Sequence, residues 1–164
     1  MNKSATPSIL PLVRGAVIAA LYAALTLLLA PISYSWLQVR FSEALTLLPI
    51  LLPEAVPGVA VGCLIANLLS PMGVSVPDVI LGTAATLLAA MATRRLRGRF
   101  WLAASMPVIA NGLIVGALVH YVYTPEIALP LCMGSVAAGE AVACLIAGPL
   151  LLRALRRLPA GILG

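Results

Sequence analysis

Apolar stretches long enough to cross a lipid bilayer make up most of this sequence. A transmembrane helix needs about 20 predominantly apolar residues, and four stretches qualify with their flanks: 11–30, 78–93, 100–122 and 126–152. Only 9% of the 164 residues are charged, and the mean hydropathy is +1.12. A soluble domain needs far fewer apolar residues than this to form one hydrophobic core. The sequence therefore predicts an integral membrane protein. Its first stretch is expected to be a transmembrane helix and not a cleaved signal, because no convincing A-x-A site follows it.

The apolar stretch 41–70 is too long for a single crossing. Thirty residues of α-helix extend about 45 Å, whereas the hydrocarbon core is about 30 Å thick. The stretch is also interrupted by Pro49, Pro53 and Pro57. We therefore expect two shorter helices, 41–53 and 57–70. The predicted fold is an all-α membrane protein, a compact bundle of six transmembrane helices that forms one domain over residues 1–164.

Basic residues flank the apolar stretches. Most of them form two clusters: Arg94, Arg95, Arg97 and Arg99, and Arg153, Arg156 and Arg157. Six helices place both termini on the same side of the membrane, together with Lys3, Arg14 and both arginine clusters. The positive-inside rule identifies this side as the cytoplasm. We therefore expect a multi-pass protein of the plasma membrane, with 153–164 as a basic cytoplasmic tail and Arg40 as the only outer cation. Nucleic-acid binding is not expected, because no aromatic side chains that could stack on bases lie between the arginines of either cluster.

Metal sites and the common hydrolytic centres have no counterpart in the sequence. Cys63, Cys132 and Cys144 are scattered through apolar sequence, and one histidine does not complete a usual zinc site. These cysteines are expected to be small buried hydrophobic residues. The sequence has no GxxxxGK[ST], HExxH or GxSxG motif. We therefore do not expect an enzyme or a cofactor in this chain, and any ATP-driven work would come from separate subunits.

Two carboxylates, Glu43 and Glu140, lie inside apolar stretches. An acidic side chain at the centre of a membrane helix costs about 2.5–3.5 kcal/mol, so a substrate, an ion or a proton is the usual reason for keeping one. For Glu140, which shares a helical face with small residues, a ligand site is the favoured interpretation. Glu43 is close to Arg40 at helical spacing, so a local ion pair at the outer interface is an equal alternative to ligand binding.

Other polar residues have both a structural and a functional interpretation. Asp78 follows a proline at a helix start, where capping of free N–H groups is favoured. Asn67 and Asn111 are either ligand contacts or partners in interhelical hydrogen bonds. Glu54 is expected to be a solvated residue of the inner turn between two helices.

Aromatic residues near the predicted outer surface are further candidates. Tyr34, Trp36 and Phe41 are either interfacial anchors or a stacking lid over a planar ligand. Tyr123 lies in a short outer turn and is also available for stacking. His120 is expected to be an ordinary interfacial side chain, with ligand binding as the lesser alternative.

Small residues recur along the first helix. Ala16, Ala20 and Ala24 follow one another at four-residue spacing. Such spacing lets another helix approach closely. On spacing alone, a partner protein and packing within the same chain are equally good explanations.

Several segments resemble one family of membrane transporters. The run FSEALTLLPILLPEAVPGVAVGCLIANLLSPMGV, followed by DVILGTAATLLAA, is similar to the QueT family of queuosine-precursor transporters. The similarity extends to RGAVIAALYAALTLLL, QVRFSEAL, NGLIVGAL and GEAVACLIAGPLLL. The segment 42–67 is the specific part, because its prolines, glycines and polar residues match in order.

The resemblance implies a substrate-binding S component of an energy-coupling factor (ECF) transporter. Such a protein has six helices and captures a micronutrient, here a 7-deazaguanine such as queuine or preQ1. It works with a transmembrane T subunit and two ATPase subunits that use ATP and Mg²⁺, and its first helix packs on the T subunit. The resemblance thus implies a partner surface at Ala16, Ala20 and Ala24.

The chemistry of the candidate residues agrees with such a ligand. One carboxylate, Glu140 or Glu43, accepts the adjacent N–H and amino groups of a deazaguanine edge in bidentate fashion. Asn67 or Asn111 donates to the base carbonyl, and an aromatic residue stacks on the ring. The alternatives are an S component for another vitamin, a solitary permease that uses Glu140 for proton coupling, and a membrane scaffold without a ligand.

Overall fold

The computed structural model describes residues 9–33 and 39–157, and this part of the chain is all-helical, as predicted. Tyr34 and Trp36 lie outside the described residues. The 3₁₀ helix η1 and three π-helical segments, η2, η3 and η4, accompany the α-helices. The elements in chain order are α1 (Leu10–Leu28), α2 (Ala30–Ser33), η1 (Phe41–Ile50), α3 (Ala55–Leu68), η2 (Asp78–Gly82), α4 (Thr83–Arg95), α5 (Phe100–Leu118), η3 (Val119–Tyr123), α6 (Leu129–Ala141), η4 (Val142–Ala147) and α7 (Gly148–Leu155).

Three continuous helices of the described chain are long and apolar enough to cross a membrane. They are α1, the helix Phe100–Tyr123 formed by α5 and η3, and the helix Leu129–Leu155 formed by α6, η4 and α7. The apolar stretch 78–93 forms η2 and α4, whose last turn carries Arg94 and Arg95. The interruption of the stretch 41–70 lies between the end of η1 and the start of α3.

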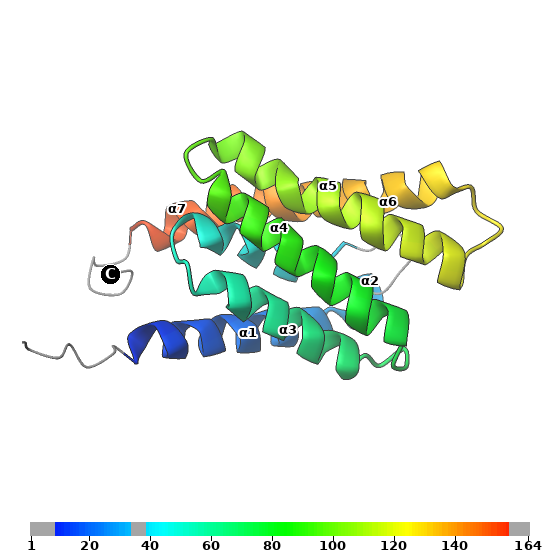
Figure 1. Cartoon of the computed structure of the whole chain (residues 1–164), viewed down its shortest axis with the longest axis horizontal. Helices are drawn as coiled ribbons and strands as arrows, with labels where there is room; N and C mark the ends of the chain where they lie inside the picture. Colours follow the sequence, from blue (N-terminus) through cyan, green and yellow to red (C-terminus); the bar gives the residue numbers. More distant parts are fainter. Residues whose placement is uncertain (1–8, 34–38, 158–164) are drawn as a thin grey trace, which may run out of the picture.

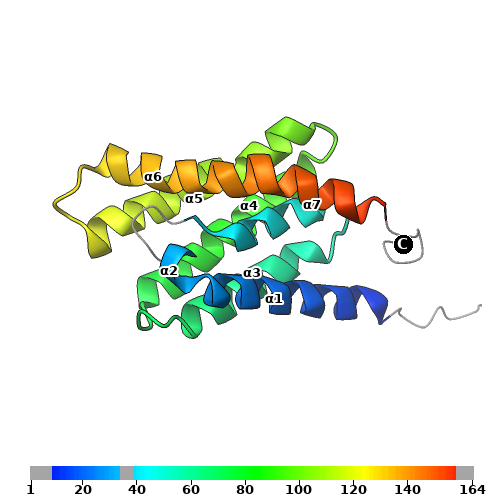
Figure 2. The same ribbon diagram turned by 180° about the vertical axis from the view of Figure 1, so that it is seen from behind.

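The helices form an elongated bundle around η1 (Figures 1 and 2). Along its sides α1 packs against α3, α5 packs against α6, and α4 contacts both α3 and α5. The start of α1, the connection from α4 to α5 and the end of α7 lie at one end of the bundle, on the left in Figure 1. This basic end carries Arg14 and both arginine clusters. The connections from α3 to η2 and from η3 to α6 lie at the opposite end.

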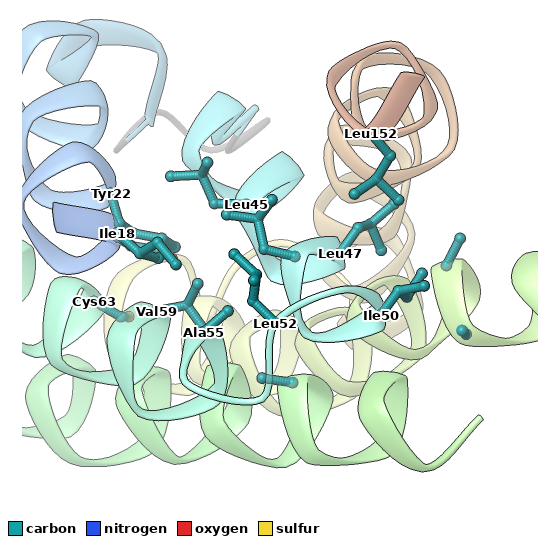
Figure 3. Packing of buried hydrophobic residues seen from close by; sticks show 14 residues of the cluster. Ile18, Tyr22, Leu45, Leu47, Ile50, Leu52, Ala55, Val59, Cys63 and Leu152 are labelled. Carbon is teal, nitrogen blue, oxygen red and sulfur yellow. The ribbon is translucent and has the colours of Figure 1, made fainter. Parts of the chain in front are cut away.

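The helix η1 is the core of the bundle. All of its residues except Phe41 are buried. Figure 3 shows leucine and isoleucine side chains of this segment between α1 on one side and the C-terminal helix on the other. Leu47 has no exposed surface, and the same apolar cluster contains Leu45, Ile50, Ile18, Tyr22 and Leu152. Contacts with α1, α3, α4, α5, η4 and α7 thus cover η1 on all sides.

Arg94 closes the end of η1. Carbonyl groups at the end of a helix lack partners within it. The Nη1 atom of Arg94 donates to the carbonyl oxygens of Pro49, at 3.0 Å, and Ile50, at 3.4 Å. An arginine in the last turn of α4 therefore satisfies two carbonyl groups and ties η1 to the basic end.

Glycines allow close helix packing at two interfaces. A Cβ atom on Gly62 of α3 would lie 2.6 Å from the Tyr22 Cβ and 2.7 Å from the Ala19 carbonyl oxygen of α1. A Cβ atom on Gly116 of α5 would lie 2.5 Å from the Met133 Cα of α6. Such distances are too short for any side chain, so the backbones approach closely only because both residues are glycines.

Gly62→Ala is expected to lower the free energy of unfolding by about 1–3 kcal/mol, because the added methyl group must push α1 and α3 apart. Titration of the purified protein with a denaturing detergent measures this change. The matched control is Gly134→Ala, since a Cβ atom at Gly134 in α6 meets nothing within 4 Å. The control should be neutral or stabilising by up to about 1 kcal/mol. Equal stabilities of the two variants would contradict the packing argument.

Candidate functional site: a buried cluster of carboxylates and amides

Glu43 lies in the first turn of η1, inside the bundle. Its side chain is 1% exposed. Its Oε1 atom accepts hydrogen bonds from the Tyr22 hydroxyl of α1 and from the Thr86 hydroxyl of α4, the latter at 3.4 Å. The Thr86 hydroxyl also lies 3.3 Å from the sulfur of Cys63 in α3. Groups from α1 and α4 therefore hold this carboxylate inside the bundle, and Cys63 of α3 contacts one of them.

Glu140 in α6 is the second buried carboxylate, with 3% of its surface exposed. Its Oε1 atom accepts a hydrogen bond of 3.0 Å from Nδ2 of Asn111 in α5. The Cys144 thiol lies 3.7 Å from Oε2 of Glu140 and 3.4 Å from the backbone carbonyl oxygen of Glu43. The Asn111 amide is also within interaction range of the Glu43 carboxylate. Asn111 and Cys144 therefore connect the two acids in one polar cluster.

Arg40 supplies the positive charge of this cluster. One of its terminal nitrogens, Nη2, donates to Oδ1 of Asn67 at 3.2 Å, and Nδ2 of Asn67 donates to the backbone carbonyl of Asp78 at 2.9 Å. The guanidinium interacts electrostatically with both Glu43 and Glu140. An ion pair at the outer interface was one expectation for Arg40 and Glu43. The structure instead buries both, leaving Arg40 6% exposed.

Two oxygen atoms of the cluster are buried without a hydrogen-bond partner among the described residues. They are Oε2 of Glu43 and Oδ1 of Asn111. Buried polar atoms normally have partners, because an unpaired one costs about 1–3 kcal/mol. The Asn111 oxygen is an acceptor, and the Glu43 oxygen is one when the acid is ionised. The cluster can therefore accept hydrogen bonds from a ligand that brings N–H or O–H donors.

Asp78 and Tyr123 form a separate contact at the opposite end from the basic clusters. The Tyr123 hydroxyl donates to the Asp78 carboxylate. The expected capping role of Asp78 is wrong, since its side chain makes no cap hydrogen bond. The helix begins before Asp78, and the Ser75 hydroxyl accepts from the Asp78 N–H at 3.4 Å. Asp78 is linked to the cluster through its backbone carbonyl, which accepts from Asn67.

The remaining candidates lie outside the cluster. Phe41 is 39% exposed and Tyr123 is 48% exposed. The Nδ1 atom of His120 lies 2.7 Å from the carbonyl oxygen of Ile127, and its ring packs edge-on against Tyr121. None of these three rings is buried against the two carboxylates.

Glu54 is paired, which corrects the expectation of a solvated loop residue. Its carboxylate lies 3.4 Å from Nη1 of Arg14, and the side chains are 12% and 17% exposed. The residues are forty positions apart in sequence, so no local spacing indicated the pair. The contact joins α1 to the start of α3 at the basic end.

The exposed surface of α1 contains the alanine series. Ala16, Ala20 and Ala24 are all exposed, whereas the neighbouring Ala19 and Ala23 are buried. Close packing within the chain uses the buried face, where α1 meets Gly58 and Gly62 of α3. Ala16 also borders an apolar groove between α1 and α3, away from the buried carboxylates. The three alanines are therefore free for contact with lipid or with another protein.

Sequence reasoning missed several side chains of the cluster: Tyr22, Cys63, Thr86 and Cys144. Tyr22 and Thr26 lie one turn apart on α1 and both face inward, which was a usable signal. The Thr26 hydroxyl lies 2.7 Å from that of Ser42. The three cysteines are buried as expected, yet Cys63 and Cys144 are also polar neighbours of the two acids.

Comparison with known proteins identifies the family. Searches of curated proteins and of solved structures return no significant match. A family model described as QueT transporter matches residues 12–157. The matched region includes every residue of the buried cluster, all of α1 after its first two residues, and the other two membrane-length helices. The chain is therefore a membrane protein and belongs to the QueT transporter family.

Proposed function

We propose that this chain is the substrate-binding S component of an ECF importer and captures a 7-deazaguanine such as queuine or preQ1. The observation that carries the proposal is the buried cluster in which Glu43 and Glu140 meet Arg40, Asn67 and Asn111. A polar site in the centre of an apolar bundle is suited to a small polar ligand whose hydrogen-bonding groups must all be met.

The donors and acceptors of the cluster match a deazaguanine. The edge of the base presents an N–H and an exocyclic amino group side by side, which a carboxylate accepts in bidentate fashion. The base carbonyl accepts a hydrogen bond from an amide or guanidinium, and Asn67, Asn111 and Arg40 carry such donors. The cluster thus has both kinds of partner that the base requires.

The positions of the charges support an orientation in the plasma membrane. The start of α1, the connection from α4 to α5 and the end of α7 share the basic end, which the positive-inside rule makes cytoplasmic (Figure 1). In the proposed topology six helical segments cross the membrane and both termini are cytoplasmic. The ligand then enters from the end that carries Asp78 and Tyr123.

Thermal unfolding of the purified protein in detergent tests the substrate. Queuine and preQ1 are compared with guanine and riboflavin. A ligand that binds only the folded state stabilises it by about 2.7 kcal/mol at a hundredfold excess over its Kd. Stabilisation by the deazaguanines alone is expected. Stabilisation by riboflavin alone would indicate an S component for another vitamin, and no shift with any compound would contradict the proposal.

The alanines of α1 are the proposed surface for a T subunit, which works with two ATPase subunits that use ATP and Mg²⁺. Small side chains let a partner helix approach closely, and Ala16, Ala20 and Ala24 are exposed together. Ala20→Leu is expected to abolish co-purification with the T subunit and ATPases while leaving the ligand-induced thermal shift unchanged. Ala138→Leu on the exposed side of α6 is the matched control. Normal assembly of the Ala20 variant would rule out this surface.

A proton-coupled permease is the second candidate, because Glu140 is a deeply buried acid inside a membrane-length helix. Proton relays in membranes use such residues. Uptake that stops when a protonophore collapses the proton gradient, at constant ATP, would favour this candidate. Uptake that stops when ATP is depleted, at constant gradient, would favour the importer.

A further inference from the structure

The basic end of the bundle has an excess of positive charge. Six of its arginines are exposed: Arg95, Arg97, Arg99, Arg153, Arg156 and Arg157. The sequence has five acidic residues, all within the described part of the chain. Only Glu54 lies at this end, and it is paired with Arg14. The counter-charges of the six exposed arginines therefore come from outside the chain.

The fold brings the two arginine clusters to one apolar core. Leu96 and Phe100, which lie beside the first cluster, pack against the group of buried residues that contains Leu47. Leu151 and Leu155, which lie beside the second cluster, pack against the same group. Figure 1 shows the connection from α4 to α5 and the end of α7 at the same end of the bundle. Two segments far apart in sequence therefore form one basic surface.

An exposed apolar stripe on α4 leads to the first arginine cluster. Leu88 and Met91 lie seven and four residues before Arg95, a spacing that places all three on one face of a helix. The two apolar side chains are 53% and 41% exposed. Trp101, in the first turn of α5, is 67% exposed, and tryptophan is enriched at the level of the lipid headgroups. The first cluster therefore lies where apolar surface ends and headgroups begin.

The last helix repeats this arrangement at the second cluster. Ile146 and Leu150 lie seven and three residues before Arg153 and are 61% and 59% exposed. A phospholipid has the same order of groups, with a charged phosphate next to apolar acyl chains. An acidic segment of a soluble protein would match the arginines but not the apolar stripes that adjoin them. The combination of both features therefore favours a lipid.

We propose that the basic end is a binding surface for anionic phospholipids. The phosphate groups accept hydrogen bonds from the exposed arginines, whose guanidinium groups suit bidentate contacts with phosphate. The acyl chains lie along the stripes of α4 and the last helix. Basic surfaces between membrane helices recognise anionic headgroups in this way. The surface is separate from the proposed substrate site, because none of its residues belongs to the buried cluster.

Two lipids that differ in headgroup charge test this surface. Native mass spectrometry of the full chain, released from detergent, gives Kd values for phosphatidylglycerol and for phosphatidylcholine with identical acyl chains. One arginine near a membrane surface contributes roughly fivefold to the binding of an anionic lipid. Because several arginines contribute, phosphatidylglycerol is expected to bind at least about tenfold more tightly. Equal Kd values for the two lipids would overturn the proposal.

A double variant locates the preference. Arg95→Gln combined with Arg153→Gln is expected to reduce it by at least about fivefold, and both arginines are exposed, so the variant should fold. The matched control is Met72→Glu combined with Val74→Glu, which lowers the net charge equally at two exposed positions of the opposite end. The control should keep the wild-type preference. An equal loss in both variants would show attraction by net charge and overturn the assignment to the basic end.

Two further measurements separate this proposal from its alternatives. A short polyglutamate peptide should not displace phosphatidylglycerol, since it lacks acyl chains. Displacement by the peptide would indicate a surface for an acidic protein and overturn the lipid assignment. The thermal shift with deazaguanines should be the same in the Arg95, Arg153 double variant and in the wild-type protein. Failure of the lipid preference would therefore leave the proposed function standing.

Discussion

Glu140→Gln is expected to lower the affinity for a 7-deazaguanine about thirtyfold to a thousandfold, which corresponds to about 2–4 kcal/mol. The Glu140 carboxylate accepts from Asn111 and is the proposed acceptor for two ring donors. A glutamine side chain carries an NH₂ group in place of one oxygen, so one donor of the ligand meets another donor. The remaining hydrogen bond also loses its assistance from charge.

Calorimetry with queuine or preQ1 measures the loss for Glu140→Gln. The matched control is Glu126→Gln, because Glu126 is exposed in the connection between η3 and α6. The control should bind as the wild-type protein does. Unchanged affinity in a folded Glu140 variant would remove Glu140 from the site, and a loss in both variants would indicate a nonspecific effect of charge.

Arg40→Met is expected to destabilise the protein by about 3–5 kcal/mol. Removing one partner of a buried set of charges leaves the others uncompensated, and here Glu43 and Glu140 lose the guanidinium that interacts with both. Asn67 also loses the donor to its Oδ1 atom. The free energy of unfolding, measured by denaturing-detergent titration without ligand, gives the effect.

A second substitution shows whether charge causes the loss in Arg40→Met. Adding Glu43→Gln removes one of the stranded carboxylates, so the double variant should be more stable than the sum of the single changes implies. Arg95→Met is the control, because this arginine is exposed at the basic end, and it should change stability by no more than about 0.5 kcal/mol. Simple additivity of Arg40→Met and Glu43→Gln would show that the two residues are not coupled.

The sequence predicted the long helices and the two carboxylates of the cluster for simple physical reasons. Long apolar stretches leave few structures other than membrane helices. A charge inside such a stretch stands out, and for this reason Glu43 and Glu140 were recognisable as candidates, whereas Arg40 was noticed as an outer cation at helical spacing from Glu43. The structure brings these residues together with Asn67 and Asn111.

The contacts that sequence could not predict join residues far apart in the chain. The Arg14–Glu54 and Tyr123–Asp78 pairs depend on how whole helices pack. The capping role of Asp78 was wrong because Ser75, three residues earlier, occupies the helix start. Hydroxyl and thiol groups such as those of Thr86 and Cys144 are common on membrane helices, so their presence alone did not indicate a site.

The position of η1 also constrains the order in which the chain can fold in the membrane during its synthesis. Ten residues of 3₁₀ helix extend about 20 Å, which is less than the thickness of the hydrocarbon core, and Glu43 makes lateral release into lipid unfavourable. Part of its cover comes from Leu152 and the other residues of the last helix. During synthesis η1 therefore stays incompletely covered until the final helix leaves the ribosome. Chains that lack that helix therefore leave the Leu47 side of η1 without the cover that Leu152 and Gly148 provide.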